Sequence, residues 1–272
     1  NVGSFITSNN GDFNICIFHQ PAGPTNDFCV NATSLTPGSA CNTVAGNMRY
    51  TTSIGPASPG APCASAALQT YDAWYSFVAT STTHAVTVSG LGSNLTAATT
   101  YMQLFSGACG SLVSLGCQPV STSSGRLTNT ALTIGVTYYI RIFVTTNPIA
   151  SPTSGWNFNI CVQSPPANDL CAGAITLTPG ATCTNTAGTL DLTVASVLPG
   201  SGCVAAGTYY DVWYRFTATS VSHTITLSRY GTNFTAPRII MYTAAGCPVG
   251  APLTCASAYT VTQGTSIGTV YY

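Results

Sequence analysis

The chain contains two copies of one sequence unit. The stretch YDAWYSFVATSTTHAVTVSG at Tyr71–Gly90 returns as YDVWYRFTATSVSHTITLS at Tyr210–Ser228. With the period of two that a β-strand has, Ala73, Tyr75 and Phe77 share one face of an expected strand. The duplication requires that one fold be built twice along the chain.

A second alternating stretch follows each copy of this strand after a short polar turn. It runs from His84 to Val88 in the first unit and from His223 to Leu227 in the second. Two alternating stretches about a polar turn predict a β-hairpin at the centre of each unit. On the more polar face of the first strand lie Trp74 and Trp213, which we expect either under a covering loop or in a surface contact.

The composition supports an all-β chain and excludes two classes of partner. Only 4% of the 272 residues are charged, and the chain has neither Lys nor Glu, two good helix formers. A formal net charge of +0 provides no basic field for nucleic acid, and no apolar run reaches the roughly 18 residues of a membrane span. The near absence of charge also lowers the electrostatic cost of self-association.

The order of motifs predicts three segments: residues 1–20, module one at 21–163 and module two at 164–272. Each module is expected to be an antiparallel β-sandwich of jelly-roll type, with about eight or nine short strands. The first segment reads as the end of a module, because GDFNICI at Gly11–Ile17 aligns with WNFNICV at Trp156–Val162. Module two stops at Tyr272, before the equivalent of that closing strand, and Asn1 is expected to be a processed or truncated start.

The N-terminal strand is therefore expected to complete module two of a neighbouring copy, in a head-to-tail homopolymer. A linker of eight residues, Phe18–Thr25, spans at most about 29 Å, which is less than a domain of roughly 40 Å. In this arrangement Cys16 is expected to bond Cys171. The residues assigned to the inter-subunit strand are Gly11, Asp12, Phe13, Asn14, Ile15, Cys16 and Ile17.

Twelve cysteines indicate disulfides, an oxidising compartment and an extracellular or cell-surface location. Six cysteines in module one allow 15 pairings. Short separations around equivalent strands favour one scheme for both modules. The expected pairs are Cys41–Cys63, Cys109–Cys117 and Cys29–Cys161 in module one, and Cys183–Cys203 and Cys247–Cys255 in module two.

Several motifs carry a resemblance to a known family. They are NDxC followed by LTPGxxC, the YDxWYxFxATSxxHxxT stretch, the cysteines around CGSLVSLGC, TIGVTYYIRIFV and the closing FNICV. Together they resemble tandem repeats of secreted Bacteroidetes surface proteins, similar to pre-peptidase C-terminal β-sandwich modules. The resemblance implies gliding-type adhesins or substrates of type IX secretion. Many such modules carry acidic residues where this chain has Gln118–Val120 and Ala256–Ala258, so no calcium site is expected.

No group of residues predicts catalysis, a metal or a cofactor. GTSIG at Gly264–Gly268 matches the GxSxG elbow, but that motif needs a helix after its strand, and here strands flank it. His84 and His223 occupy equivalent positions, which indicates a repeated structural role. Asp72 and Asp211 precede the Trp strands, where backbone hydrogen bonding explains them.

The sequence leaves three classes of function to weigh. The favoured one is a structural subunit or repeat segment of an extracellular filament or adhesin, assembled by β-strand complementation with disulfides. The alternative is a pair of carbohydrate-binding accessory modules of a secreted enzyme, with surface glycans as partners. An enzyme in its own right lacks a catalytic constellation.

Overall fold

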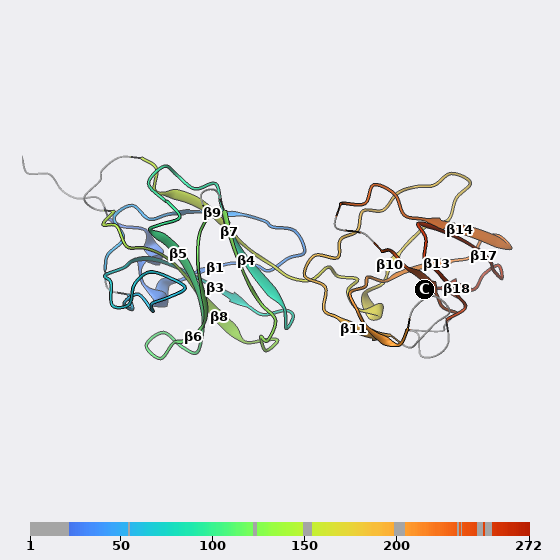
Figure 1. The fold of residues 1–272 in the computed structure, drawn as a ribbon, viewed down its shortest axis with the longest axis horizontal. Helices are drawn as coiled ribbons and strands as arrows, with labels where there is room; N and C mark the ends of the chain where they lie inside the picture. Colours follow the sequence, from blue (N-terminus) through green and yellow to red (C-terminus); the bar gives the residue numbers. More distant parts are fainter. Residues whose placement is uncertain are drawn as a thin grey trace, which may run out of the picture.

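The structure is a computed structural model in which the chain forms two β modules joined after the strand β9 (Asn157–Gln163) (Figure 1). No helix of the described chain has the length and apolar character needed to cross a membrane. The predicted class, all-β with two tandem sandwich modules, is confirmed. The structure describes residues 22–53, 55–121, 124–148, 154–198, 205–232, 234, 236–243, 247 and 252–272.

Module one consists of two facing sheets with an apolar core between them. The core includes Tyr75, Phe77, Val88, Ile140 and Phe158. The five-stranded sheet has the order β1 (Thr33–Ser34), β3 (Tyr71–Val78), β8 (Thr137–Val144), β5 (Thr100–Ser106) and β6 (Val113–Pro119). The four-stranded sheet has the order β2 (Val44–Asn47), β9 (Asn157–Gln163), β4 (His84–Ser89) and β7 (Ser124–Asn129). Two short 3-10 helices, η1 (Thr25–Asp27) and η2 (Cys29–Asn31), precede these strands.

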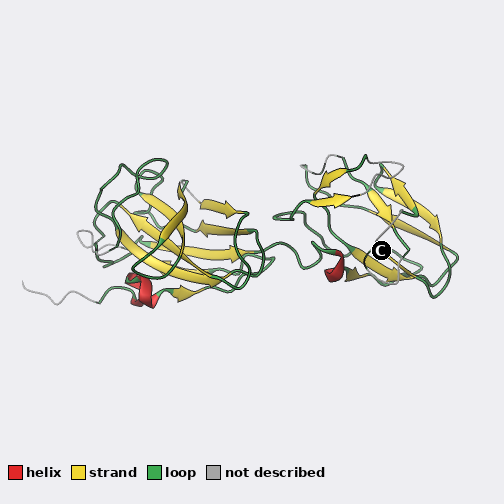
Figure 2. Ribbon diagram, turned by 90° about the horizontal axis from the view of Figure 1, so that it is seen from below, coloured by secondary structure: helices red, strands yellow, loops and turns green. Residues whose placement is uncertain are grey.

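Module two repeats this order with shorter strands (Figure 2). Its described core contains Phe216, Ile239, Met241, Val261 and Tyr271. Its three-stranded sheet has the order β10 (Ile175–Thr176), β13 (Tyr214–Thr217) and β18 (Val270–Tyr271). Its two-stranded sheets are β11 (Ser196–Leu198) with β12 (Gly207–Tyr209), β14 (Ser222–Thr226) with β17 (Thr260–Gly264), and β15 (Ile239–Met241) with β16 (Thr254–Ala256). The helix η3 (Cys171–Gly173) corresponds to η2, and the strands β10 and β13–β18 correspond in order to β1 and β3–β8.

The expected hairpin at the centre of the unit is wrong. β3 pairs with β1 and β8 in one sheet, whereas β4 pairs with β7 and β9 in the other. The polar turn between β3 and β4 thus carries the chain across the sandwich. The crossing lets the inward residues of both strands, such as Tyr75 and Val86, face one shared core from opposite sides.

Trp74 is buried, so the surface-contact alternative for this residue is wrong. Its side chain is 2% exposed and its ring lies 5.7 Å from that of Phe105. The segment that opens module one holds this part of β3, because the Asn26 side chain donates a hydrogen bond to the Trp74 carbonyl. Asn168 makes the same bond to the carbonyl of Trp213, which is half-buried. The repeated asparagine therefore fixes the start of each module to its Trp strand.

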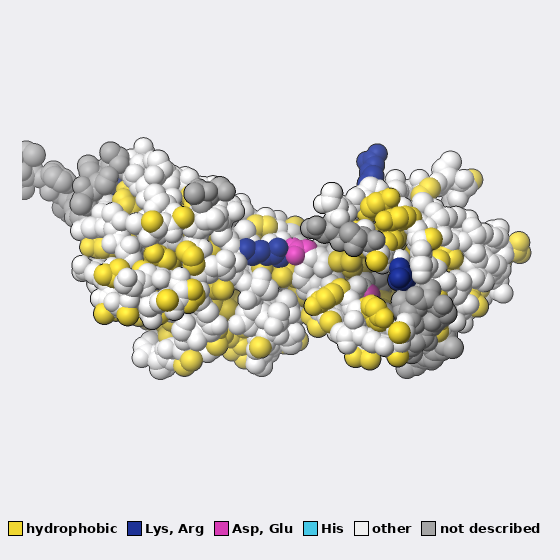
Figure 3. All heavy atoms as spheres, viewed as in Figure 1, with side chains coloured by type: hydrophobic (Ala, Val, Ile, Leu, Met, Phe, Trp, Pro, Cys, Tyr) yellow, Lys and Arg dark blue, Asp and Glu magenta, His cyan; other side chains and the backbone are white. Residues whose placement is uncertain are grey.

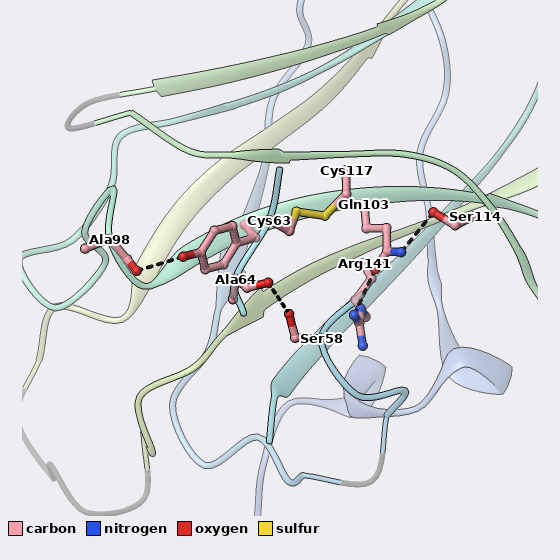
Figure 4. Close-up of a disulfide and its surroundings, with 9 residues drawn as sticks. Ser58, Cys63, Ala64, Ala98, Gln103, Ser114, Cys117 and Arg141 are labelled. Atoms are coloured by element: carbon pink, nitrogen blue, oxygen red, sulfur yellow. Dashed lines mark hydrogen bonds between the residues drawn. A yellow bond between two sulfur atoms is a disulfide. The ribbon is translucent and has the colours of Figure 1, made fainter. Parts of the chain in front are cut away.

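All three expected disulfides of module one are wrong. Cys117 on β6 is in register with Gln103 and not with Cys109, which lies in the turn after β5. Cys117 instead bonds Cys63 in the loop that covers the outer face of the five-stranded sheet (Figure 4). The observed pairs, which replace Cys109–Cys117, Cys41–Cys63 and Cys29–Cys161, are Cys29–Cys109, Cys41–Cys161 and Cys63–Cys117, with Cα separations of 5.7, 5.4 and 5.9 Å.

Sheet pairing explains why Cys41 meets Cys161. Cys41 lies just before β2, and β2 is hydrogen-bonded along its length to β9, which carries Cys161. Cys63 belongs to a loop on the opposite sheet, and Cys29 lies beside β3 in that same opposite layer. Separation along the chain was therefore a poor guide, because each bond joins elements that the sandwich brings together.

The expected pairs of module two are also wrong. Cys183 and Cys247 are both unbonded, whereas Cys255 is in a disulfide. This excludes Cys183–Cys203 and Cys247–Cys255. Cys255 aligns with Cys117, and the counterpart of Cys63 is Cys203, which lies outside the described residues.

Charged side chains are sparse on the surface of the molecule. The face in Figure 3 shows a few basic and acidic groups among many uncharged atoms. One ion pair links the modules, with Arg126 Nη2 2.9 Å from Asp191 Oδ1, and both side chains are exposed. An exposed pair of this kind contributes only about 0–1 kcal/mol to stability.

Candidate functional site: an open strand position in module two

In module one, β9 is an interior strand of the four-stranded sheet. It pairs antiparallel with β2 on one side and with β4 on the other. Its alternate residues Phe158, Ile160 and Val162 point into the core and are at most 2% exposed. The strand therefore completes both the backbone hydrogen bonding of the sheet and the apolar filling beneath it.

In the described part of module two, no strand fills the equivalent position. β14, the counterpart of β4, pairs with β17 along one edge, and its other edge has no strand partner among the described residues. Residues 184–189, which align with β2 and its flanks, are exposed and form no strand there. An edge with unpaired N–H and C=O groups is a template for another strand.

The apolar residues beneath this position are less buried than their counterparts. Tyr214, Ile225 and Leu227 are half-buried. The equivalent residues of module one, Tyr75, Val86 and Val88, are at most 2% exposed. The residues that are more exposed in module two are the counterparts of residues that β9 covers in module one.

Two aligned glycines, Gly46 and Gly188, show the space that the Phe158 ring takes in module one and that the described residues of module two leave unfilled. A Cβ at Gly46 would overlap the Phe158 ring and the Tyr75 hydroxyl. A Cβ at Gly188 would overlap the Tyr214 hydroxyl, and among the described residues no ring in the place of Phe158 lies within contact distance of it. In module one the two rings pack edge to face at a centroid distance of 6.1 Å. Module two thus keeps the glycine and the tyrosine of this arrangement.

One side-chain hydrogen bond crosses the open position. The Ser228 hydroxyl donates to Asn185 Oδ1 at 3.2 Å. Both residues are exposed, so a strand that enters must break a bond that contributes only about 0.5–1.5 kcal/mol.

Among the described cysteines of module two, Cys183 precedes the segment that flanks the open position, whereas Cys171 and Cys247 align with cysteines of the opposite layer. Cys183 aligns with Cys41, is exposed, and has no disulfide partner. Cys171 lies within hydrogen-bonding distance of Cys247, the pair that aligns with Cys29 and Cys109. Burial, together with the neighbouring Cys247 thiol, raises the pKa of Cys171 to about 12.

The other candidate residues from the sequence, the two histidines and the GTSIG motif, have structural roles. The His84 and His223 rings lie beside Phe77 and Phe216 and contact threonines of the preceding turn, which supports a repeated structural role. GTSIG begins at the last residue of β17 and leads into β18, so the helix that a nucleophile elbow needs does not follow it. Among the described residues, no group of three His, Cys, Asp or Glu side chains is placed to hold a metal ion.

Sequence reasoning did not connect Gly188, Tyr214 and Cys183 with the open position. The alignment of Gly46 with Gly188 and of Cys41 with Cys183 contained the signal, but its meaning depended on the neighbours of β9. The strand residues Gly11–Ile17, including Cys16, lie outside the described residues.

Comparison with known proteins identifies the modules. A family model described as galactose binding domain-like, and associated with type IX secretion, matches residues 25–160 and again residues 167–272. The search of curated proteins gave no match. The two matched segments together cover most of the chain.

Proposed function

This chain belongs to the galactose-binding-domain-like family associated with type IX secretion, and we propose that it is a structural subunit of an extracellular filament or adhesin. The family is named for binding and not for a reaction, and its association with type IX secretion makes this a secreted or cell-surface protein. In the proposed assembly, Gly11–Ile17 of one copy enters the open position beside β14 of the next copy. The unfilled edge of β14 is the observation that carries the proposal.

The sequence of the donor segment fits the position. Gly11–Ile17 reads GDFNICI, and the strand that fills the position in module one reads WNFNICV. By this alignment Phe13, Ile15 and Ile17 correspond to the three inward residues of β9. Because apolar and polar residues alternate in the donor segment, its apolar side chains would all lie on one face and would cover Tyr214 and Leu227.

The direction of the chain favours donation between copies. η1 lies on the side of module one that faces away from module two, and η3 lies on the side of module two that faces the link (Figure 2). A segment that precedes η1 is therefore tethered at the far end of its own molecule from β14. Repetition of this head-to-tail contact generates an open filament.

The free energy gained from burial and hydrogen bonding at this contact is similar in size to the free energy that association costs. Burial of one Phe and two Ile side chains contributes about 1.5–3 kcal/mol each. Backbone hydrogen bonds to β14 add about 0.5–1.5 kcal/mol apiece. Association costs about 4–15 kcal/mol in lost freedom of motion. We therefore expect assembly that depends on protein concentration unless a covalent bond secures the joint.

Deletion of residues 1–18 tests the proposal. The full chain is expected to form oligomers that grow with concentration, in light scattering and in negative-stain microscopy, and the shortened chain is expected to remain monomeric. A peptide of residues 11–18 with Cys16→Ser should bind the shortened chain and raise the Tm of module two. The same peptide with Phe13→Asp and Ile15→Asp is the matched control, and it should have no effect. Long fibres of the shortened chain would contradict the proposal.

A second candidate function is glycan binding by module two. Tyr230 and Tyr259 stack at a centroid distance of 4.1 Å, with Phe234 6.4 Å from Tyr230, and Tyr230 is 50% exposed. In module one the position of Tyr230 is held by Leu91. Aromatic rings commonly line small-molecule sites, and the family description names galactose.

This candidate predicts binding of galactose-containing glycans that depends on Tyr230. On a glycan array, the unaltered protein should bind such glycans and Tyr230→Ala should lose at least tenfold in affinity, because an exposed ring face is removed. Leu91→Ala is the matched control in module one and should keep the affinity. Equal binding by all three proteins would exclude this site.

A further inference from the structure

We infer that the joint between copies is a disulfide from Cys16 of one copy to Cys183 of the next, and not to Cys171 as the sequence alone suggested. The inference rests on the proposed function, and names the bond at that same site. It follows from the pairing of β9 in module one, from the neighbours of Cys171, and from the number of cysteines.

The pairing of β9 gives the register of the incoming strand. In module one, Cys161 on β9 lies opposite Thr87 on β4, and Ile160 lies opposite Val88. Cys161 bonds Cys41, which precedes β2 on the other side of β9, with a Cα separation of 5.4 Å. The bond therefore joins the interior strand to the segment that flanks it away from β4.

The same register in module two fixes the partner of Cys16. Cys16 aligns with Cys161, and Thr226 aligns with Thr87. A strand that pairs with β14 as β9 pairs with β4 brings Cys16 opposite Thr226. The flanking segment then presents Cys183, the counterpart of Cys41, and this cysteine is exposed and unbonded.

Cys171 has a different neighbour. Its thiol is within hydrogen-bonding distance of Cys247, and this pair aligns with the Cys29–Cys109 disulfide. We expect Cys171 and Cys247 to form the same clasp on oxidation. Cys255, already bonded, corresponds to Cys117.

With this assignment every one of the twelve cysteines in the sequence has a partner. Three disulfides in module one, the Cys171–Cys247 pair and the bond of Cys255 use ten of the twelve cysteines when Cys203 is the partner of Cys255. Cys16 and Cys183 remain. Cys16 aligns with Cys161 and Cys183 aligns with Cys41, so the two are together equivalent to a bond that exists in module one.

The bond forms by thiol–disulfide exchange with a low-molecular-weight disulfide such as oxidised glutathione. The Cys183 thiolate attacks that disulfide and releases one glutathione thiolate. The Cys16 thiolate then attacks the mixed disulfide and releases the second. The two protons that the cysteines lose are taken up by the two glutathione thiolates, so one disulfide is reduced for each joint that forms.

The experiment uses the full chain incubated with oxidised glutathione. Gel electrophoresis without reductant should show a ladder of covalent multimers, and peptic peptide mapping should find Cys16 linked to Cys183 and Cys171 linked to Cys247. Cys16→Ser and Cys183→Ser should each reduce the ladder to monomer. A mixture of these two variants should give covalent dimers and nothing larger, because only one donor cysteine and one acceptor cysteine remain per pair.

Controls separate this inference from the proposed function. The double variant Cys63→Ser/Cys117→Ser removes a disulfide inside module one and should keep the ladder. Cys183→Ser should still form non-covalent oligomers in light scattering, whereas Ile15→Asp should abolish oligomers of both kinds. A Cys16–Cys171 peptide, a ladder that persists in Cys183→Ser, or a Cys16–Cys183 link found within monomers would overturn the inference. Loss of oligomers in every protein, the unaltered chain included, would overturn the proposed function as well.

Discussion

Replacement of Arg141 by methionine should destabilise module one by about 3–5 kcal/mol, because it leaves a buried carboxyl group without its cation. Arg141 on β8 is fully buried, and its Nη1 lies 3.6 Å from Asp72 Oδ1. The guanidinium also donates from Nη2 to Gln103 Oε1 at 2.8 Å (Figure 4). Its Nη1 donates to the Pro56 carbonyl. Its carbon Cζ lies 4.2 Å from the centre of the Phe143 ring. Urea unfolding followed by tryptophan fluorescence measures the loss.

The stability of module one, and the loss of stability in Arg141→Met, should both depend on pH. Burial raises the pKa of Asp72 from its ordinary 3.8 to about 7, although Arg141 opposes the rise. Folding therefore takes up a proton between these values, so the free energy of unfolding should fall as the pH increases from about 4 to about 7. Without Arg141 the pKa of Asp72 rises further, and the fall should continue above pH 7.

Two further variants test this explanation. Arg141→Met combined with Asp72→Asn should recover part of the lost stability and flatten the pH dependence, since no carboxyl group remains to ionise. Arg215→Met is the matched control in module two, where Arg215 is exposed and donates to Thr176, and it should change stability by about 0.5 kcal/mol or less. An Arg141→Met protein with unchanged unfolding would show that the buried pair adds no stability.

The same substitution at two aligned positions should affect folding in one case and association in the other. Phe158 is 1% exposed in the core of module one, so Phe158→Ala should cost about 3–5 kcal/mol of stability. In the proposed assembly Phe13 fills the matching place in a neighbouring copy. Phe13→Ala should therefore weaken association by a factor of roughly 10² or more and leave the unfolding of the isolated monomer unchanged.

Monomer unfolding and concentration-dependent light scattering measure the two effects separately. Val113→Ala is a suitable control, because Val113 is 60% exposed at the start of β6 and should alter neither measurement. If Phe13→Ala lowers the stability of the monomer and leaves association intact, the strand packs within its own chain.

The sequence alone determined the class of fold and the duplication. Period-two alternation around Tyr75 and its counterpart Tyr214, with few helix formers and many Thr and Gly residues, indicated strands in both modules. These are local properties, since the side chains of a strand alternate regardless of which strands lie beside it. The alignment of Gly11–Ile17 with β9 was likewise visible in the sequence.

Only the tertiary structure decided which elements are neighbours. β3 and β4 read as a hairpin, yet they belong to opposite sheets, and this also moved Cys41 and Cys63 to opposite layers. The disulfides follow the pairing of strands, because a bond needs Cα atoms about 5–6 Å apart, and a strand such as β9 gains its neighbours from residues more than 60 positions away. Alternation along a strand records which face is apolar. It carries no record of the partner strand, and for this reason the position beside β14 and the place of Cys183 emerged only from the assembled sandwich.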